Sequence, residues 1–393
     1  MTIYPRKGEK HIKGSGVASY SKNLVAHITD DTIDQTVVCD AIDESPRSYT
    51  DDGTVVRRVF RRKPQFILSV HRELKKIDAD VVHIQQELAL YGGIFSAYLL
   101  QWLVFIWRRR VVITLHGVVD PDAITPRFVH ENNSRLPVPL VKLAFRVIYT
   151  PLMKWARRII VHEQYFKDIL VRRYGVRSDK IDVVPHGVEE LDTHPKTLAR
   201  EKLGIGSAAD VALFMGYATG YKGIDLLIEG FAEYAKRNPN AYLIIGAGKH
   251  PKLQRDETYL AEYGRLQNKA AELIPATQYR WDGFIPESDI VLYYSASDVS
   301  VYPYTTALSS SGPMSFAIGF EKPFLVSSAF ADIFSQYPHL LFDRYAKDLA
   351  LLLDYFFTHR NEYEQISRNM KQERSWSKVG AKTRQVYATI GVR

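Results

Sequence analysis

The residues best suited to chemistry are a histidine and a lysine that each precede a glycine. His116 follows the apolar run 111–115, and Lys222 lies just before an apolar segment with helical spacing. A histidine at a strand end can donate a hydrogen bond to a ligand hydroxyl or to a leaving oxygen. A lysine at a helix start offers a positive charge to a diphosphate, beside amide groups that also favour anions. Both residues are therefore predicted to be functional, although a structural histidine or an exposed lysine has the same pattern.

Two short segments rich in glycine or serine precede expected helices, where they could present backbone amides to a pyrophosphate. A tight turn explains the first segment equally well, and a serine N-cap explains the second. The residues are Gly14, Ser15 and Gly16 in the first segment, and Ser310, Ser311 and Gly312, with the strand-end residue Tyr304, in the second.

Four further candidates lie at the ends of expected strands. Glu87 precedes an apolar helix, where an unpaired carboxylate would be costly, so it either caps that helix or reaches the ligand. His186 either lines the ligand site or caps its strand, and Gly187 permits a close turn there. Gly216 ends the first strand of the second half, where a phosphate-binding loop belongs.

These candidates depend on a repeated alternation of apolar strands with amphipathic helices. The strand-like runs are nearly continuous in Val, Ile and Leu, as in strands that are buried on both faces. Such alternation indicates parallel sheets with right-handed crossovers, which bind ligands at the carboxyl ends of their strands. The expected strands are 36–41, 80–84, 111–115, 159–162, 181–185, 211–215, 242–245, 279–281, 299–302 and 323–326. The expected helices are 17–28, 65–77, 94–107, 164–174, 224–236, 259–272, 288–295 and 311–320.

The alternation restarts near residue 208, after a turn-rich stretch over 185–207. We therefore predict an α/β protein with two Rossmann-like, doubly wound parallel-sheet domains that face each other across a cleft. The first domain is expected over 1–190 and the second over 191–370, followed by a final helix within 371–393.

Charge distribution limits the choice of partners. Residues 1–190 carry 29 Lys and Arg against 22 Asp and Glu, so most of the formal net charge of +8 lies in the first half. Basic clusters occur at 57–63, 108–110 and 154–158, and they are either solvated faces or sites for phosphate-rich partners. Because two of the clusters adjoin apolar helices, a peripheral membrane surface is favoured over nucleic acid.

The cysteine content and the apolar stretches indicate the compartment. The single cysteine, Cys39, lies in an apolar run and is expected to pack in the core, which fits a reducing, cytoplasmic compartment. The longest apolar stretch, 94–107, is shorter than the roughly 20 residues that a membrane-spanning helix needs. The first residues contain no apolar segment of the kind found in secretory signals, so none is expected.

Taken in order, these segments resemble the family-4 glycosyltransferases, which have the two-Rossmann GT-B fold. GSGVASYSKNL is similar to that family's opening glycine loop, and DVVHIQQE, VVITLHG and KIDVVPHGV are similar to strand ends of its first domain. LFMGYATGYKGIDLLIEGF is similar to the start of its donor domain, where Lys222 matches the diphosphate-binding lysine. DGFIPESDIVLYYSASDVSVYPY and SSSGPMSFAIGFEKP resemble its base-contacting turn and its diphosphate-facing helix. The tail SWSKVGAKTRQVYATI resembles its final helix, which crosses back to the first domain.

The resemblance implies transfer of a hexosyl unit from a nucleoside-diphosphate sugar to an acceptor hydroxyl, with retention at the anomeric carbon. The acceptor would be a glycan, a lipid-linked molecule or a polysaccharide precursor. Gly283 and Phe284 would lie near the nucleotide base, and His116 would orient the sugar. No residues have the spacing of metal ligands, so neither a metal nor a cofactor is expected, and the sugar nucleotide is a substrate.

Two departures from the family pattern leave an alternative open. The family commonly has two glutamates around the diphosphate-facing helix, and Leu308 and Phe316 occupy those positions here. An arginine often found near Tyr217 is also absent. Either the donor is held by backbone and serine groups, or the chain is a catalytically silent nucleotide-sugar-binding protein on the same fold.

Overall fold

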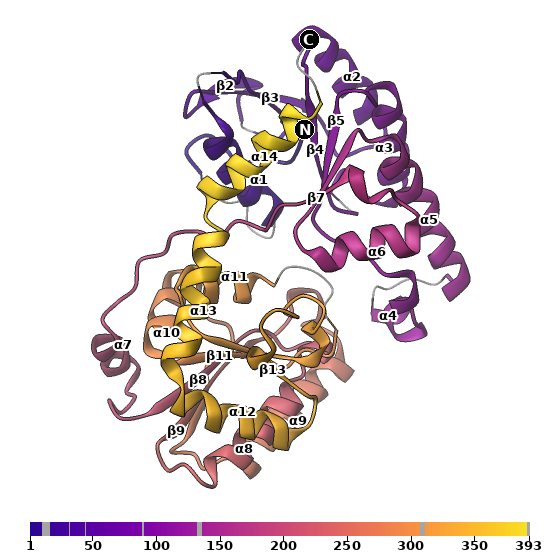
Figure 1. The fold of residues 1–393 in the computed structure, drawn as a ribbon. Helices are drawn as coiled ribbons and strands as arrows, with labels where there is room; N and C mark the ends of the chain where they lie inside the picture. The colour runs from indigo at the N-terminus through magenta and orange to yellow at the C-terminus, as the bar shows by residue number, and fades with distance from the viewer. Residues whose placement is uncertain are drawn as a thin grey trace. The chain divides into compact units, whose positions relative to one another are not determined.

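The computed structural model describes residues 1–9, 16–30, 32–43, 45–88, 90–131, 136–306 and 311–390. Contacts divide this part of the chain into two compact units, drawn in Figure 1. The first unit comprises residues 1–187 and 374–390, and the second comprises 188–306 and 311–373. Four residues of interest in the sequence, Gly14, Ser15, Leu308 and Ser310, lie outside the described residues.

The first unit contains two small sheets. A parallel sheet has the order β4-β5-β6-β7 and consists of β4 (Val82–Gln86), β5 (Val111–Leu115), β6 (Arg158–Val161) and β7 (Ile181–Val183). The second sheet has the order β1-β3-β2 and consists of β1 (Thr36–Asp40), β2 (Ser48–Asp51) and β3 (Thr54–Phe60). β1 and β3 are parallel, whereas β2 and β3 form an antiparallel hairpin that was not predicted. Asp52 and Gly53 both have positive φ at its turn, as two-residue hairpin turns require.

Helices cover both faces of the parallel sheet in the first unit. Val112 and Ile160 pack in one cluster with α1 (Gly16–Ile28) and α14 (Trp376–Ala388). Ile113 and Ile159 point to the other face, as alternate residues of a strand must, and pack in a second cluster. The helices of that second face are α2 (Phe66–Ile77), α3 (Ile94–Ile106), α5 (Val138–Trp155) and α6 (Gln164–Tyr174), and α4 (Pro126–Glu131) precedes α5. Cys39 is buried in the core near β3, as expected.

The last helix, α14, packs against α1 within the first unit. Gly380 makes this close packing possible, because a Cβ atom there would lie 2.2 Å from the carbonyl oxygen of His27. The Arg384 guanidinium donates to that same oxygen at 2.9 Å. The C-terminal helix is thereby fixed to the end of α1.

The second unit has a single six-stranded sheet in which every neighbouring pair is parallel. Its order is β10-β9-β8-β11-β12-β13, so it reads 3-2-1-4-5-6 when numbered from its own first strand, which is the Rossmann order. The predicted α/β class with parallel sheets is thus confirmed. The strands are β8 (Asp210–Tyr217), β9 (Ala241–Gly248), β10 (Tyr279–Trp281), β11 (Val299–Tyr302), β12 (Phe324–Ser327) and β13 (Leu341–Phe342). The helices are α7 (Lys196–Leu203), α8 (Ile224–Ala235), α9 (Glu257–Leu273), α10 (Ile290–Ala296), α11 (Gly312–Gly319), α12 (Ala346–Thr358) and α13 (Arg360–Glu373).

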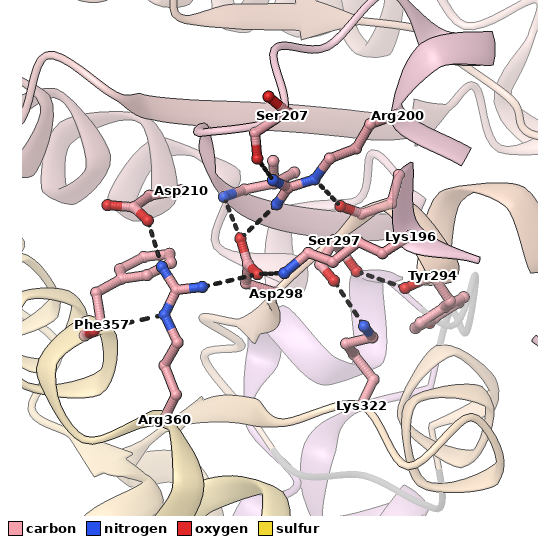
Figure 2. A network of polar contacts seen from close by, with 12 residues as sticks. Lys196, Arg200, Ser207, Asp210, Tyr294, Ser297, Asp298, Lys322, Phe357 and Arg360 are labelled. Atoms are coloured by element: carbon pink, nitrogen blue, oxygen red, sulfur yellow. Dashed lines mark hydrogen bonds and ion pairs between the residues drawn. The ribbon is translucent and has the colours of Figure 1, made fainter. Parts of the chain in front are cut away.

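A buried carboxylate holds the starts of β8 and β11 together. Asp298, just before β11, accepts a hydrogen bond from the backbone N–H of Val211 at 2.7 Å. Figure 2 shows Lys196, Arg200 and Arg360 converging on the same carboxylate, with Arg200 at 2.8 Å and Arg360 at 3.1 Å. These three cations come from α7 and α13, so one carboxylate fastens two helices to the sheet. The Asp298 carboxylate therefore has hydrogen-bond donors and positive charges from the chain itself. We assign the amino-terminal ends of β8 and β11 a structural role.

Candidate functional site

The sheet order of the second unit identifies where a ligand would bind. Strand order reverses between β8 and β11, and open parallel sheets bind ligands at such a switch point, outside the carboxyl ends of the strands. The loops that follow these two strands touch, because the Thr305 N–H donates to the Tyr221 carbonyl oxygen at 2.7 Å. Gly223 has a φ of +67°, and a Cβ atom there would lie 1.9 Å from the Pro303 carbonyl oxygen. Only glycine therefore fits the point where the two loops meet.

Lys222 lies in this loop contact, immediately before α8. Its side chain is 7% exposed, and its ammonium group lies 3.8 Å from the ring centre of Tyr304 and 4.9 Å from that of Tyr221. No hydrogen-bond acceptor or carboxylate pairs with the ammonium among the described residues. Burial alone lowers the pKa of Lys222 to about 7. Within the described part of the chain, the ammonium thus contacts two aromatic faces and no acid, and a buried cation of this kind is well placed to receive an anion from outside the chain.

The same loops contain two further polar groups. Thr219 was not predicted from the sequence, whereas Ser311 was predicted as either a ligand contact or a helix N-cap. The Thr219 hydroxyl, three residues before Lys222, is buried and has no hydrogen-bond partner within the described part of the chain. Ser311 occupies the N-cap position of α11, but its hydroxyl bonds the Tyr304 hydroxyl at 2.9 Å and caps no amide. The start of α11, including Gly312, is therefore not capped by its own serine, and a helix start of this kind favours an anion.

An exposed aromatic pair lies at the same edge of the second unit. Phe284, which follows β10, is 64% exposed and stacks on the ring of Tyr217 at the end of β8, with ring centres 6.2 Å apart. Gly283 has a φ of +68°, and a Cβ atom on Gly248 would lie 3.0 Å from the Phe284 Cβ. Glycine at both positions therefore lets Phe284 lie close against the end of β9. Gly216 also has positive φ, at +151°, and faces the Lys222 side chain.

His116 belongs to a buried network in the first unit, and both of its ring nitrogens are engaged. Nδ1 lies 3.2 Å from Nε2 of His162, and Nε2 lies 2.9 Å from the Gln85 side chain. His162 Nδ1 faces the Val184 carbonyl oxygen at 3.0 Å and must donate to it, so in the neutral ring its Nε2 accepts. His116 Nδ1 therefore donates to His162, which leaves the Nε2 of His116 as an acceptor.

The remaining members of the network fit this ordering. If the Gln85 carboxamide is turned so that its NH2 group faces His116, His83 Nε2 can donate to the Thr114 hydroxyl at 2.7 Å or to the Gln85 oxygen at 3.3 Å. His83 Nδ1 then accepts from the Tyr387 hydroxyl of α14 at 2.6 Å. Burial lowers the pKa of His116 well below its ordinary value and lowers the pKa of both His83 and His162 to about 3. Neutral rings, which this ordering requires, are accordingly the favoured state near pH 7.

His186 and Gly187 are part of the same buried region. A Cβ atom on Gly187 would lie 2.5 Å from the Trp376 indole, so glycine is required for the packing of α14 rather than for a turn alone. His186 Nδ1 lies 2.8 Å from the Gly187 carbonyl oxygen, and burial lowers the pKa of His186 to about 4. The Tyr20 ring contacts the rings of His116, His162, His186 and Trp376, with centres 4.7 to 5.2 Å apart. This aromatic cluster was not predicted, because its members are far apart in the sequence.

Glu87 and Gly16 occupy less enclosed positions in the first unit. Glu87 is exposed and does not cap α3, because that helix begins seven residues later at Ile94, with Gly93 at its N-cap position. The capping interpretation is therefore wrong. Gly16 opens α1, is exposed, and has open space where a Cβ atom would lie. The predicted site residues thus fall into two groups, one in each unit.

Comparison with known protein families gives two matches, one for most of each unit. The family description Glycosyltransferase Family 4 matches residues 14–190, and Glycosyl transferases group 1 matches residues 195–373. The chain belongs to glycosyltransferase family 4. Its structure resembles sucrose-phosphate synthase from Thermosynechococcus elongatus, with a TM-score of 0.69 and 16% identity over 99% of this chain and 98% of that one. It also resembles HepE from Anabaena, solved in complex with UDP, with a TM-score of 0.67 and 15% identity over 99% and 100% of the two chains.

Relatives with curated functions match over shorter lengths. Mannosylfructose-phosphate synthase of Agrobacterium fabrum is 26% identical over 212 residues, which are 51% of this chain and 45% of that protein. D-inositol 3-phosphate glycosyltransferase of Nocardia farcinica is 30% identical over 139 residues, 34% of this chain and 29% of that protein. The matched part of this family-4 member thus spans less than half the length of either relative.

Two features are absent from the described residues. No cluster of three or more His, Cys, Asp or Glu side chains there has an arrangement that could hold a metal ion. No helix in the described ranges combines the length and the apolar character that crossing a membrane requires.

Proposed function

We propose that this chain transfers a hexosyl unit from a nucleoside-diphosphate sugar to an acceptor hydroxyl, with retention at the anomeric carbon. The observation that carries the proposal is Lys222, a buried cation at the β8–β11 switch point with no acidic partner among the described residues. Glycosyl transfer from such a donor releases a diphosphate, whose developing charge must be stabilised as the glycosidic bond breaks. Lys222 supplies a positive charge at the position where the Rossmann order predicts a ligand.

The groups around Lys222 suit the remaining parts of the donor. The start of α11 and the unpartnered Thr219 hydroxyl would donate hydrogen bonds to the diphosphate oxygens. The exposed Phe284 ring would stack on the nucleotide base, an interaction that any base allows. Gly216 and Gly283 would let the backbone approach the donor closely. These assignments agree with the roles that the family resemblance implies for the same segments.

In the first unit, we assign His116 to the sugar and Glu87 to the acceptor side. In the neutral proton ordering, His116 Nε2 accepts, so a sugar hydroxyl would bind it by taking the place of the Gln85 carboxamide. This differs from the donor role that the sequence suggests, because His162 fixes which nitrogen carries the proton. Gly16, at the start of α1, would add a backbone amide near the donor. His186 and Gly187 would support this group through Trp376 and Tyr20.

The names of the relatives suggest a class of acceptor. Mannosylfructose-phosphate synthase, D-inositol 3-phosphate glycosyltransferase and sucrose-phosphate synthase all carry a phosphorylated compound in their names. We therefore propose that the acceptor hydroxyl belongs to a phosphorylated molecule, either a small polyol or sugar phosphate or a lipid-linked glycan precursor. An acceptor panel that contains both kinds separates these two.

The test begins with a thermal-shift screen of nucleoside diphosphates and their sugars, since a ligand that binds only the folded state raises the melting temperature. The donor found in this way is then incubated with the acceptor panel, and the product is analysed by mass spectrometry and by NMR of the anomeric proton. We expect one donor to give a product with retained configuration. Failure of every diphosphate to raise the melting temperature would contradict the proposal.

A silent nucleotide-sugar-binding protein is the second candidate, and the residue at position 316 favours it. Phe316 stands where the family commonly has a glutamate, and its ring packs on Tyr294 and Phe320 of the second unit. An apolar ring cannot accept a hydrogen bond from a ribose hydroxyl as a carboxylate does. Donor binding without transfer or hydrolysis across the acceptor panel would support this candidate.

A further inference from the structure

The outer face of α3 is unusual because the helix is apolar on every side. Its sequence is IFSAYLLQWLVFI, and Leu100, Leu103 and Val104 are buried against the sheet. The opposite side is equally apolar but exposed, with Trp102 49% exposed and Phe95 60% exposed. A helix that is hydrophobic all round is normally covered on all sides or in contact with lipid. The exposed residues of this side are Ile94, Phe95, Trp102, Phe105 and Ile106.

Helix α5 extends this exposed apolar face. α3 and α5 lie side by side (Figure 1), and the Trp155 ring of α5 contacts the rings of Trp102 and Phe105, with centres 6.2 and 5.0 Å apart. Four more apolar side chains are exposed along or just before α5, namely Leu136, Leu140, Leu143 and Val147. We call the nine exposed apolar residues of the two helices the α3–α5 face. Single exposed leucines are ordinary, but nine exposed apolar side chains on and beside two packed helices mark an interaction surface.

The charged residues of α3, of α5 and of the segments that directly flank them all have one sign. Residues 94–110 and 136–158 contain no Asp or Glu. Five cations of these segments form no ion pair among the described residues, namely Arg109, Lys142, Arg146, Lys154 and Arg157. Glu73 of the neighbouring α2 is already paired with Arg57 and Lys76.

The basic cluster at 57–63 differs from the cations beside α3 and α5, because most of its side chains bind groups of the first unit. A run of cations in the sequence is therefore not sufficient evidence for a site that binds an anionic partner. Arg58 is buried and donates to the carbonyl oxygens of Pro5 and Asp40. Arg62 pairs with the Asp40 carboxylate at 2.7 Å. Most of that cluster is therefore used inside the first unit. The five cations named above, which follow α3 or lie on and just after α5, are instead available to a partner.

We propose that the α3–α5 face binds an anionic membrane surface. A bilayer offers a continuous apolar layer beneath a continuous layer of phosphates, which matches exposed Trp, Phe and Leu side chains bordered by Arg and Lys. Tryptophan in particular favours the boundary between lipid tails and headgroups. A second copy of this chain fits poorly, because two identical faces would bring cations of the same sign together. The face lies on the bilayer and does not cross it, since α3 has only 13 residues.

The experiment is co-sedimentation of the full chain with vesicles, and it needs no sugar donor, so its outcome is independent of the proposed function. One set of vesicles is phosphatidylcholine alone, and the other contains phosphatidylglycerol at about one lipid in three. We expect binding to the anionic vesicles that weakens as salt is raised, because salt screens charges near the surface. Little binding to phosphatidylcholine alone is expected under the same conditions.

Matched variants test which face makes the contact. Trp102→Glu and Lys154→Glu should each lower the fraction bound to anionic vesicles at least tenfold. Leu351→Glu and Lys347→Glu, on α12 of the second unit, introduce the same charges at exposed positions and should leave binding unchanged; Leu351 is 48% exposed, like Trp102. Unchanged circular dichroism and melting temperature show that each variant is folded. Absence of vesicle binding by the wild type, equal binding by all variants, or a dimer in light scattering that Trp102→Glu dissociates would each overturn the proposal.

Discussion

Replacing Lys222 by methionine should make the free protein more stable while it abolishes donor binding. The ordinary lysine pKa of 10.5 falls to about 7 in the folded unit because the amine is buried. That difference corresponds to about 4–5 kcal/mol of unfavourable burial of the charged form. Methionine keeps the length and the apolar stem of lysine without the charge. We therefore expect the free energy of unfolding of the variant at pH 7 to exceed that of the wild type by at most about 4 kcal/mol.

The pH dependence gives this prediction a definite sign. The unfolded chain keeps the Lys222 proton up to about pH 10.5, whereas the folded unit releases it near pH 7. Between these values the unfolded state binds more protons, so the stability of the wild type rises with pH across this window. Lys222→Met has no such group, and its advantage should be complete below pH 7 and nearly gone at pH 10.5.

Urea unfolding at several pH values measures the first effect, and isothermal titration with UDP or the donor found by screening measures the second. Loss of a charge-assisted contact of about 1.5–3 kcal/mol predicts binding that is about 10 to 100 times weaker. Lys322→Met is the control for binding. Lys322 is partly buried, and it donates to the carbonyl oxygen of Ser297, which lies before β11 and therefore away from the loops that follow β8 and β11. A Lys222→Met variant that is less stable at pH 7, or that binds the diphosphate as the wild type does, would refute the reasoning.

Three further predictions concern stability and the site. Asp298→Asn should lower the free energy of unfolding by about 3–5 kcal/mol, measured by urea denaturation, because Lys196 and Arg200 lose their counter-charge and Arg360 keeps only Asp210. Gly223→Ala should fold with a distorted switch-point loop and weaken diphosphate binding in titration calorimetry at least tenfold, since its Cβ atom would meet the Pro303 carbonyl oxygen at 1.9 Å. The buried histidines should destabilise the first unit in acid. His162, whose pKa falls to about 3 in the folded unit, contributes a loss of about 2 kcal/mol between pH 7 and pH 5, because only the unfolded state takes up its proton there. The free energy of opening of 111–115 and 158–161, obtained from hydrogen exchange after correction for the intrinsic pH dependence of amide exchange, would detect this. An opening free energy that stays constant down to pH 5 would contradict it.

Most of the parallel strands could be predicted because each is a short, continuous apolar run. The ranges 111–115, 279–281 and 299–302 were expected as strands and are β5, β10 and β11. The β2–β3 hairpin was missed because β3 reads TVVRRVF, and its arginines look like a surface cluster when only charge is counted. The fate of Arg58 explains the error: its charge is buried against carbonyl oxygens that become neighbours only when residues 4–5 and 40 fold against β3.

The site was predictable to the extent that it depends on strand ends. Lys222 and Ser311 could be placed at the carboxyl ends of the strands, because each follows an expected strand and precedes an expected helix. The interactions of His116 could not be predicted in this way. They depend on Gln85 of β4 and on His162 directly after β6, the two strands that flank β5, and on a register that only the paired sheet defines. Side chains that meet across strands leave no local pattern in the sequence, so the ordered proton network becomes visible only in three dimensions.

Each end of the strand pair β8 and β11 contains a buried charged group, and the two groups have different surroundings. Before β11, the Asp298 carboxylate meets three cations and a backbone amide. In the loops after the same two strands, the Lys222 ammonium meets two aromatic faces and no acid among the described residues. Both groups are almost fully buried, so the cost of removing them from water is comparable. Among the described residues, only the Asp298 carboxylate has partners of opposite charge that offset this cost. Because the chain surrounds the Asp298 carboxylate with cations, a carboxylate beside Lys222 would be an equally available way to offset the ammonium charge. The absence of such a partner from the described part of the switch point is therefore best explained by a phosphate-bearing ligand whose negative charge offsets the Lys222 ammonium.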